Sequence, residues 1–438
     1  MALQNLLFLA VLALLPVQLN KFLFIESSYV FGIPIDYRAL SLYLSDIAII
    51  LFTAAFATDN FQNLKKIFHT NRNLYTSLIL FNLFAIANNL FREGFPIPFY
   101  FSLRVFIFSV FFIAAVQTIS RRNLNKYIYP VILISLLWQS VLIIFQFLNQ
   151  HSLGFWFLGE RSFDASTVSI AHVDIFGFQF LRSYGTFPHP NLTGAFLTLT
   201  LIFSFLEHFS KNSLKYQTLK KASVIILSEN TAGFIPRMKR ILSEDQRTTA
   251  FRLLFSISAI ALLLTFSRSA LTVFSLLILI LSKNLKSLIL KSGAFLAIVI
   301  LLLPLLITTQ LASVAERLTL TQASLDITAN NLLTGVGNTN FLTQLAKLDL
   351  TSLSQTRLIQ PVHNVFLLIL SENGILGFAI FIIFLFFVSQ KARSKTKIML
   401  FVAILIFASA DHFLWTLHQG QMLFWLSLAF IVSKPSRT

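Results

Sequence analysis

Residues 363–390, HNVFLLILSENGILGFAIFIIFLFFVSQ, decide the fold class of this chain. The stretch opens with a histidine and an asparagine and continues as a long apolar run. A helix needs about 20 mostly apolar residues to cross the hydrocarbon core of a bilayer. The segment therefore predicts a membrane-spanning helix that begins with two polar side chains.

Further apolar segments along the chain satisfy the same criterion. Together they predict an all-α integral membrane protein of about twelve transmembrane helices, forming a single polytopic membrane domain over residues 1–438. The predicted spans lie near 4–20, 40–58, 73–90, 100–119, 127–148, 190–207, 250–265, 269–282, 292–309, 363–390, 398–411 and 421–433. The N-terminal segment has neither a basic start nor a clean small-residue cleavage site, so we interpret it as the first span rather than a signal peptide.

Composition supports the membrane assignment. The chain is 56% hydrophobic and 12% charged, with 49 Phe, and its mean hydropathy is +0.77. A soluble domain carries about twice that charge. The absence of Cys excludes disulfides, thiolate metal sites, iron–sulfur clusters and cysteine nucleophiles.

The formal net charge of +17 suggests either a nucleic-acid-binding surface or the cytoplasmic excess of Lys and Arg found in membrane proteins. The distribution of charge favours the second. With the N-terminus in the cytoplasm, about 24 of the 34 basic residues fall in inner segments and about 10 in outer ones. We therefore expect no nucleic-acid partner, and we expect both termini in the cytoplasm of a bacterial cell.

Three polar segments interrupt the spans. Residues 149–189 are predicted as an extracytoplasmic loop, with a small hairpin within 167–187, where apolar and polar residues partly alternate. Residues 208–249 are predicted as a basic, mobile cytoplasmic loop. Residues 310–362 are predicted as a large extracytoplasmic loop with helical pieces and a turn at 335–337.

The unusual polar residues gather at the predicted outer boundary of the membrane. They are Arg182, His189, Asn191, Arg268, Arg317, His363, Asn364, Asp411 and His412. A guanidinium group matches phosphate oxygens, and a histidine can take a proton from a hydroxyl. The set predicts a lipid-linked phosphate or pyrophosphate substrate and transfer to a hydroxyl. No Asp-x-Asp pair lies in an outer loop, so we expect neither a metal nor another cofactor.

Each of these residues also has a structural interpretation. The arginines could end a helix or lie solvated in loops, and His189 could only shape a turn between two prolines. Asp411 and His412 could be ordinary interfacial residues. Asp46 and Glu372 could pair with an arginine of the bundle or line the site, and Gly374 and Gly377 could permit close helix packing.

At His363 the pattern becomes specific. His363-Asn364, nine residues, Gly374, two residues and Gly377 resemble the H-[NSQ]-x9-G-x-x-[GTY] signature of the O-antigen ligase family. The segments RSYGTFPHPN (182–191), LTFSRSA (264–270) and LLTGVG (332–337) are similar to other blocks of that family, in the same order. The resemblance extends over most of the chain and includes the large outer loop before the histidine.

This resemblance implies a glycosyltransferase of the GT-C-like membrane type in the bacterial cytoplasmic (inner) membrane, with its site on the outer face. Its partners would be a glycan donor on undecaprenyl pyrophosphate, a lipid or glycan acceptor, and membrane lipid. By the same resemblance, His363 would be the general base, and Arg182, Arg268 and Arg317 would hold the pyrophosphate, with Arg357 as a rival to Arg317. His189, Asn191, Asn364, Gly374 and Gly377 would shape the site.

The motif does not distinguish between three reactions within the family, which differ in the acceptor. A ligase transfers the glycan to lipid A-core, a polymerase to another repeat unit, and an oligosaccharyltransferase to a protein hydroxyl. Outside the family, a transporter of lipid-linked sugars would need polar residues along a path through the membrane, and a scaffold would need no base at His363. The gathering of polar residues at one boundary favours the enzyme.

Overall fold

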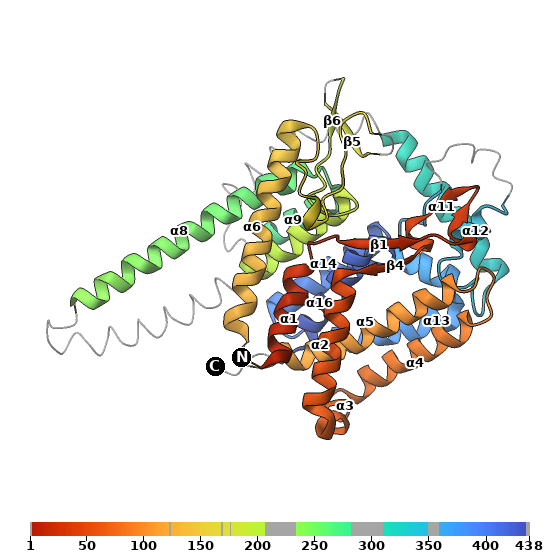
Figure 1. The fold of residues 1–438 in the computed structure, drawn as a ribbon, viewed down its shortest axis with the longest axis horizontal. Helices are drawn as coiled ribbons and strands as arrows, with labels where there is room; N and C mark the ends of the chain where they lie inside the picture. Colours follow the sequence, from red (N-terminus) through yellow and green to blue (C-terminus); the bar gives the residue numbers. More distant parts are fainter. Residues whose placement is uncertain are drawn as a thin grey trace.

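The structure, a computed structural model, describes residues 2–121, 124–167, 170–175, 177–205, 234–281, 310–348 and 359–434. The described chain is mostly helical and its helices pack as a bundle (Figure 1). The helices are α1 Leu3–Leu14, α2 Leu44–Asn60, α3 Leu64–Thr70, α4 Arg72–Asn89, α5 Ile97–Ile119, α6 Asn125–Asn149, Pro190–Phe205, α8 Phe234–Leu264, α9 Arg268–Leu281, α11 Gln310–Asn330, α12 Phe341–Leu345, α13 Val365–Ser389, α14 Lys395–Ala410, α15 Phe413–Thr416 and α16 His418–Val432.

Strands are few and short in the described part. They are β1 Asn20–Leu23, β2 Tyr29–Val30, β3 Ile33–Pro34, β4 Leu40–Tyr43, β5 His172–Ile175 and β6 Phe178–Leu181. They pair antiparallel as β1–β4, β2–β3 and β5–β6. The β5–β6 pair is the hairpin predicted within 167–187. The described fold is thus helical, with three two-stranded sheets between the helices; Figure 1 labels β1, β4, β5 and β6.

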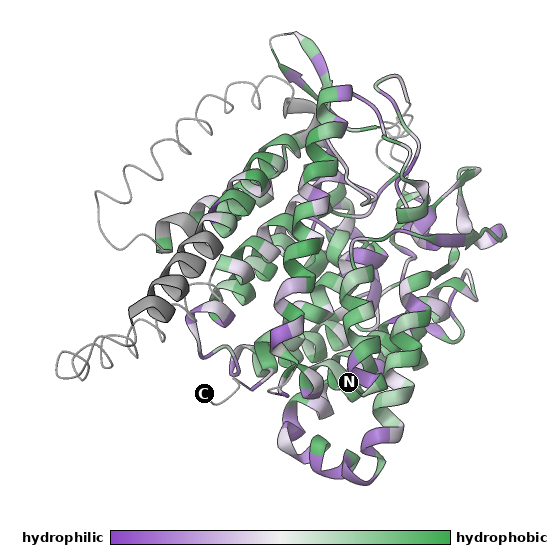
Figure 2. Cartoon of the chain, turned by 60° about the vertical axis from the view of Figure 1, so that its left-hand side comes forward, coloured by the Kyte–Doolittle hydropathy of each residue, from purple (hydrophilic) through white to green (hydrophobic). Residues whose placement is uncertain are grey.

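Four stretches of described helix are long and apolar enough to cross a membrane: Leu44–Thr70, Ile97–Ile119, Lys126–Asn149 and Val365–Ser389. Shorter apolar helices are Leu3–Leu14, Pro190–Phe205 and Thr249–Leu264. Large apolar side chains such as Ile134, Phe145 and Phe386 are exposed, as expected on helix faces that meet lipid. Hydrophobic residues cover most of the helix surfaces, and hydrophilic ones collect near helix ends and connections (Figure 2).

The boundaries of several predicted spans need correction. Residues 40–43 of the predicted span 40–58 form strand β4, and α2 begins only at Leu44. The predicted span 4–20 stops short because α1 ends at Leu14, two residues before Pro16, which cannot continue a helix. Part of the predicted loop 208–249 is also helical, since α8 begins at Phe234. The predicted span 292–309 lies outside the described residues.

Both ends of the described chain meet one end of α5. The Gln4 side chain donates to Thr118 Oγ1 at 2.9 Å, and the backbone N–H of Lys434 donates to Ser120 Oγ at 3.0 Å. Lys397, near the start of α14, donates to the carbonyl of Ser433 at the same end. Helix α14 then runs across the bundle, so Asp411, which follows it, lies at the opposite end.

Helix α13 is broken, and another backbone segment fills the break. Gly374 has φ 63° and ψ −173° inside the helix. The backbone N–H groups of Val336 and Gly337 donate to the carbonyls of Ser371 and Glu372 at 3.0 and 2.8 Å. Ile375 and Leu376 donate in turn to the carbonyls of Leu332 and Leu333. The segment 332–337 thus satisfies the backbone groups that the break exposes, as a membrane interior requires.

Candidate active site

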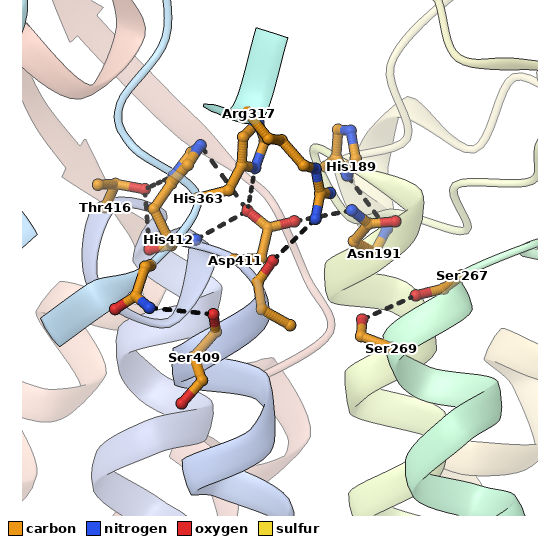
Figure 3. A network of polar contacts seen from close by, with 12 residues as sticks. His189, Asn191, Ser267, Ser269, Arg317, His363, Ser409, Asp411, His412 and Thr416 are labelled. Atoms are coloured by element: carbon orange, nitrogen blue, oxygen red, sulfur yellow. Dashed lines mark hydrogen bonds and ion pairs between the residues drawn. The ribbon is translucent and has the colours of Figure 1, made fainter. Parts of the chain in front are cut away.

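His363 stands just before α13, on the end of the bundle opposite the chain ends. The next residue, Asn364, caps the helix: its Oδ1 accepts from the backbone N–H groups of Phe366 and Leu367 at 2.9 and 3.1 Å. Its Nδ2 donates to the Ser409 carbonyl near the end of α14 at 3.2 Å. Asn364 therefore fixes both the start of α13 and its position against α14, which brings His363 beside Asp411 (Figure 3).

Asp411 is the hub of the site. Its Oδ1 lies 3.1 Å from His363 Nδ1 and accepts from the backbone N–H of His412 at 2.7 Å. Its Oδ2 accepts from Asn191 Nδ2 at 2.7 Å. Burial alone would raise the pKa of Asp411, but the hydrogen bond from His363 and the neighbouring histidines hold it well below its usual range. Asp411 is therefore a carboxylate, and it accepts a hydrogen bond from the N–H at Nδ1 of His363.

Asn191 joins this pair to an arginine. It lies at the start of helix Pro190–Phe205, and its Oδ1 accepts from Arg182 Nη2 at 2.7 Å. Arg182 Nε donates to the Thr265 carbonyl at 3.0 Å, in the turn between α8 and α9. One continuous chain of contacts thus runs from His363 through Asp411 and Asn191 to Arg182.

The other two predicted arginines face the same place. Arg317, on α11, donates through Nη1 to the carbonyl of Ala410 at 3.3 Å, directly beside Asp411 (Figure 3). Arg268, the first residue of α9, is exposed. Burial, chiefly, and the nearby charges of Arg268 and Arg317 lower the pKa of Arg182 to about 10. Three guanidinium charges against one carboxylate leave this cluster with an excess of two positive charges, which favours a doubly charged anion.

The two remaining histidines are neutral near pH 7. His189 Nδ1 accepts from the backbone N–H of Asn191 at 3.1 Å, and burial, with Arg182, lowers its pKa to about 3. Burial also lowers the pKa of His412 to about 4, while its Nδ1 lies 2.7 Å from Thr416 Oγ1. Neither adds a positive charge to the cluster, so its charge comes from the arginines.

His363, Asp411 and His412 also have the spacing of a metal site, since one ligand atom from each lies within 4.8 Å of the others. The surroundings fit a metal poorly. Both oxygens of Asp411 already accept hydrogen bonds, and three arginine charges lie close by. The residues fit an anion better than a cation.

The predicted residues converge to different degrees. The structure brings together His363, Asn364, Arg182, His189, Asn191 and Arg317, with Arg268 near enough to act on Arg182. Gly374 and Gly377 lie further along α13 and act through packing: a Cβ on Gly377 would lie 2.6 Å from the Phe84 ring. Arg357 lies outside the described residues. Asp46 lies 3.7 Å from Arg104 and away from this cluster. Of its two predicted roles, the structure therefore favours the ion pair with an arginine of the bundle.

Asp411 is the residue of this cluster to which the sequence assigns no role. An ordinary interfacial role, one of the two interpretations that the sequence leaves open, does not account for its contacts with His363, His412 and Asn191. The available signal was its position at the end of a predicted span, at the same boundary as His363. Its partners come from segments far apart in sequence, so no local pattern could identify them.

Comparison with known protein families finds a match in the second half of the chain. Residues 253–382 match a family model described as O-antigen ligase. The matched segment contains Arg268, Arg317, His363, Gly374 and Gly377. A search of curated proteins finds no match.

Proposed function

We propose, from the O-antigen ligase family membership that the match over residues 253–382 supports, that this chain transfers a glycan from undecaprenyl pyrophosphate to an acceptor hydroxyl. That family is an enzyme family of the ligase and polymerase type that acts on lipid-linked glycans in a membrane. The observation that carries the proposal is the chain of contacts from His363 through Asp411 and Asn191 to Arg182, which joins a base to a phosphate-binding group.

In this proposal His363 is the general base. Its Nδ1 proton is held by the Asp411 carboxylate at 3.1 Å, which leaves the Nε2 lone pair to accept the proton of the acceptor hydroxyl. Asp411 also stabilises the imidazolium that forms, as the carboxylate does in Ser-His-Asp enzymes. Asp411 is thus a positioning residue for His363.

The arginines serve the leaving group. As the acceptor oxygen forms its bond to the anomeric carbon, the bond from that carbon to the pyrophosphate oxygen breaks, with inversion. Undecaprenyl pyrophosphate leaves with the bonding electron pair. Arg182, Arg268 and Arg317 then neutralise its charge by donating to phosphate oxygens. No metal is needed for this step.

The acceptor decides between the members of the family. Transfer to lipid A-core makes a ligase, and transfer to a growing polysaccharide makes a polymerase; we propose the first and keep the second as the alternative. A transporter of lipid-linked sugars is less well supported, because the base, the carboxylate and the arginines gather at one end of the bundle. In this proposal, that end faces outward from the bacterial inner membrane.

The test is glycan transfer from an undecaprenyl-pyrophosphate donor in reconstituted membranes. His363→Ala should lower the rate by about 10²–10⁴-fold at an unchanged amount of folded protein, and a chelator should leave the wild-type rate unchanged. Arg268→Ala should weaken use of the donor. Normal transfer by His363→Ala would refute the mechanism, and absence of transfer by the wild type with every acceptor class would favour a transporter or scaffold.

A further inference from the structure

A polar cavity lies beside the candidate active site. It has a volume of about 40 Å³, which is room for a few water molecules. Gln18, Tyr37, Gln419, Thr416 and Pro188 contribute to its lining. Pro188 directly precedes His189, and Thr416 Oγ1 lies 2.7 Å from His412 Nδ1. The cavity therefore adjoins the cluster around Asp411.

Several polar atoms in this lining have no hydrogen-bond partner among the residues that the structure describes. Both amide atoms of Gln419, the Oε1 of Gln18 and the hydroxyl of Tyr37 are buried without a hydrogen bond. Gln419 is 1% exposed and Gln18 is 8% exposed. A buried polar group that is left unpaired destabilises the fold. Three side chains in this state around one cavity therefore indicate that a polar ligand, or water in its place, completes them.

The charges that line the cavity are already compensated. Arg104 lies 3.7 Å from Asp46 and donates to Ser41 Oγ at 2.7 Å and to Tyr100 OH at 3.0 Å. Asp36 is paired with Arg161 at 3.0 Å. Such a cavity favours a neutral ligand over a phosphate, in contrast to the arginine cluster next to it.

The unpartnered atoms suit hydroxyl groups. A primary amide such as that of Gln419 both donates and accepts, as a sugar hydroxyl does. The rings of Phe22, Tyr100 and Phe101 also line the cavity and offer apolar surface to the C–H face of a sugar. Amide pairs beside aromatic rings thus match the two kinds of surface that a sugar presents.

We infer that this cavity is the acceptor-sugar subsite: it takes the hydroxyl-bearing edge of a neutral sugar and directs the acceptor toward His363. This inference rests on the proposed transfer function. It assigns the donor and the acceptor to separate places, the pyrophosphate to the arginines and the acceptor sugar to the cavity of Gln18 and Gln419.

Saturation-transfer NMR on the full chain in nanodiscs tests the subsite without any turnover. The probes are methyl glucoside, methyl galactoside and methyl mannoside, with inorganic phosphate as a charged competitor. At least one glycoside should receive saturation from the wild type and from His363→Ala, and the signal should fall several-fold in Gln419→Leu. Gln18→Leu serves as a second variant in case Gln419→Leu does not fold. Gln4→Leu is the matched control. Gln4 is a buried glutamine of α1 that contacts Thr118, near the end of α5 that lies away from the cavity.

Kinetics separate this inference from the proposed function. Loss of one hydrogen bond of about 1.4 kcal/mol should raise the KM for the acceptor about 10-fold in Gln419→Leu, with the KM for the donor unchanged. The subsite is refuted if no glycoside is saturated, if phosphate displaces the sugar, or if Gln419→Leu behaves as Gln4→Leu does. Sugar binding without any transfer would instead refute the proposed function and leave the sugar site standing.

Discussion

At the scale of single residues, the exchange of one carboxylate for an amide tests the candidate site most directly. Asp411→Asn keeps the shape of the side chain but removes the charge that holds His363 Nδ1 at 3.1 Å. An amide can also donate to Nδ1, which would select the wrong tautomer of the base. We expect transfer to fall by at least about 10²-fold, with the KM for the donor little changed.

The control for this change is Asp59→Asn. Asp59 is exposed near the end of α2, far from His363, and its exchange should leave transfer unchanged. If Asp411 only supported the fold, Asp411→Asn would lower the yield of folded protein while the rate per folded molecule and its pH profile stayed the same. That outcome would remove Asp411 from the mechanism.

The buried histidines predict an acid-sensitive fold. Burial lowers the pKa of His412 to about 4 and that of His189 to about 3, whereas an unfolded histidine titrates near 6.5. The unfolded chain therefore binds more protons between these values. The stability that depends on neutral histidines is complete above about pH 6.5 and is lost as the pH falls toward 4.

Thermal unfolding in detergent at several pH values measures this effect. The wild-type Tm should fall between pH 7 and pH 5, and His412→Asn should show a flatter dependence because one titrating group is gone. His69→Asn is the control, since His69 is exposed on α3. An equal slope in wild type and His412→Asn would contradict the assignment of a buried, neutral His412.

At the scale of elements, the break in α13 explains why the motif requires glycine eleven residues after His363. Gly374 has φ 63° and ψ −173°, a region that only glycine enters without strain. A Cβ there would also lie 2.4 Å from backbone atoms of Leu333. Gly374→Ala should therefore destabilise the protein by about 2–4 kcal/mol and lower its Tm, because segment 332–337 can no longer complete the broken helix.

Gly177→Ala is the matched control for this prediction. Gly177, in the turn of β5–β6, also has a positive φ of 84°, but a Cβ there would meet nothing within 4 Å. Its substitution should cost about 1 kcal/mol or less. Equal losses of Tm in the two variants would show that backbone conformation alone, without the close approach of Leu333, sets the requirement for Gly374.

The sequence predicted helices better than their ends. Apolar length located α1, α2, α4, α5, α6, Pro190–Phe205, α9, α13, α14 and α16, because lipid-facing and buried positions are both apolar in a membrane protein. It did not indicate the shorter or more polar helices α3, α11, α12 and α15. It could not separate strand β4 from α2, since Leu40–Tyr43 are as apolar as the helix that follows. It also left the helical start of α8 in a loop, because residues 234–249 are too polar to signal a span.

The sequence predicted that most residues of the candidate site lie close together, but not the hydrogen bonds that join them. His363 and the arginines were found because each lies at one boundary of the predicted membrane, a property that follows from span counting. Their hydrogen-bond partners were not, because Asp411 and Asn191 are 220 residues apart in sequence. The cavity of Gln18 and Gln419 gave no signal in the sequence, because the sequence does not show whether a glutamine side chain is buried or hydrogen-bonded.

At the scale of the whole molecule, the distribution of charge and the packing together predict one arrangement. The excess of Lys and Arg predicts that both termini face the cytoplasm. In the structure, Gln4 and Lys434 both contact the same end of α5, while Asp411 lies at the other end. A bundle with both termini inside therefore presents the arginine cluster to the outer face, where a lipid-linked glycan could reach it.

The absence of Cys from the chain makes this topology directly testable. Gly177→Cys places one thiol in the β5–β6 turn, and Lys66→Cys places one on the exposed surface of α3. In intact spheroplasts, a membrane-impermeant maleimide should label Gly177→Cys and leave Lys66→Cys unlabelled until the membrane is permeabilised, with the wild type as a blank. The reverse pattern would turn the bundle over and place His363 on the cytoplasmic side. Labelling of both variants before permeabilisation would mean that α3 and the β5–β6 hairpin lie on the same side of the membrane. That outcome would contradict the three predicted spans between them, 73–90, 100–119 and 127–148.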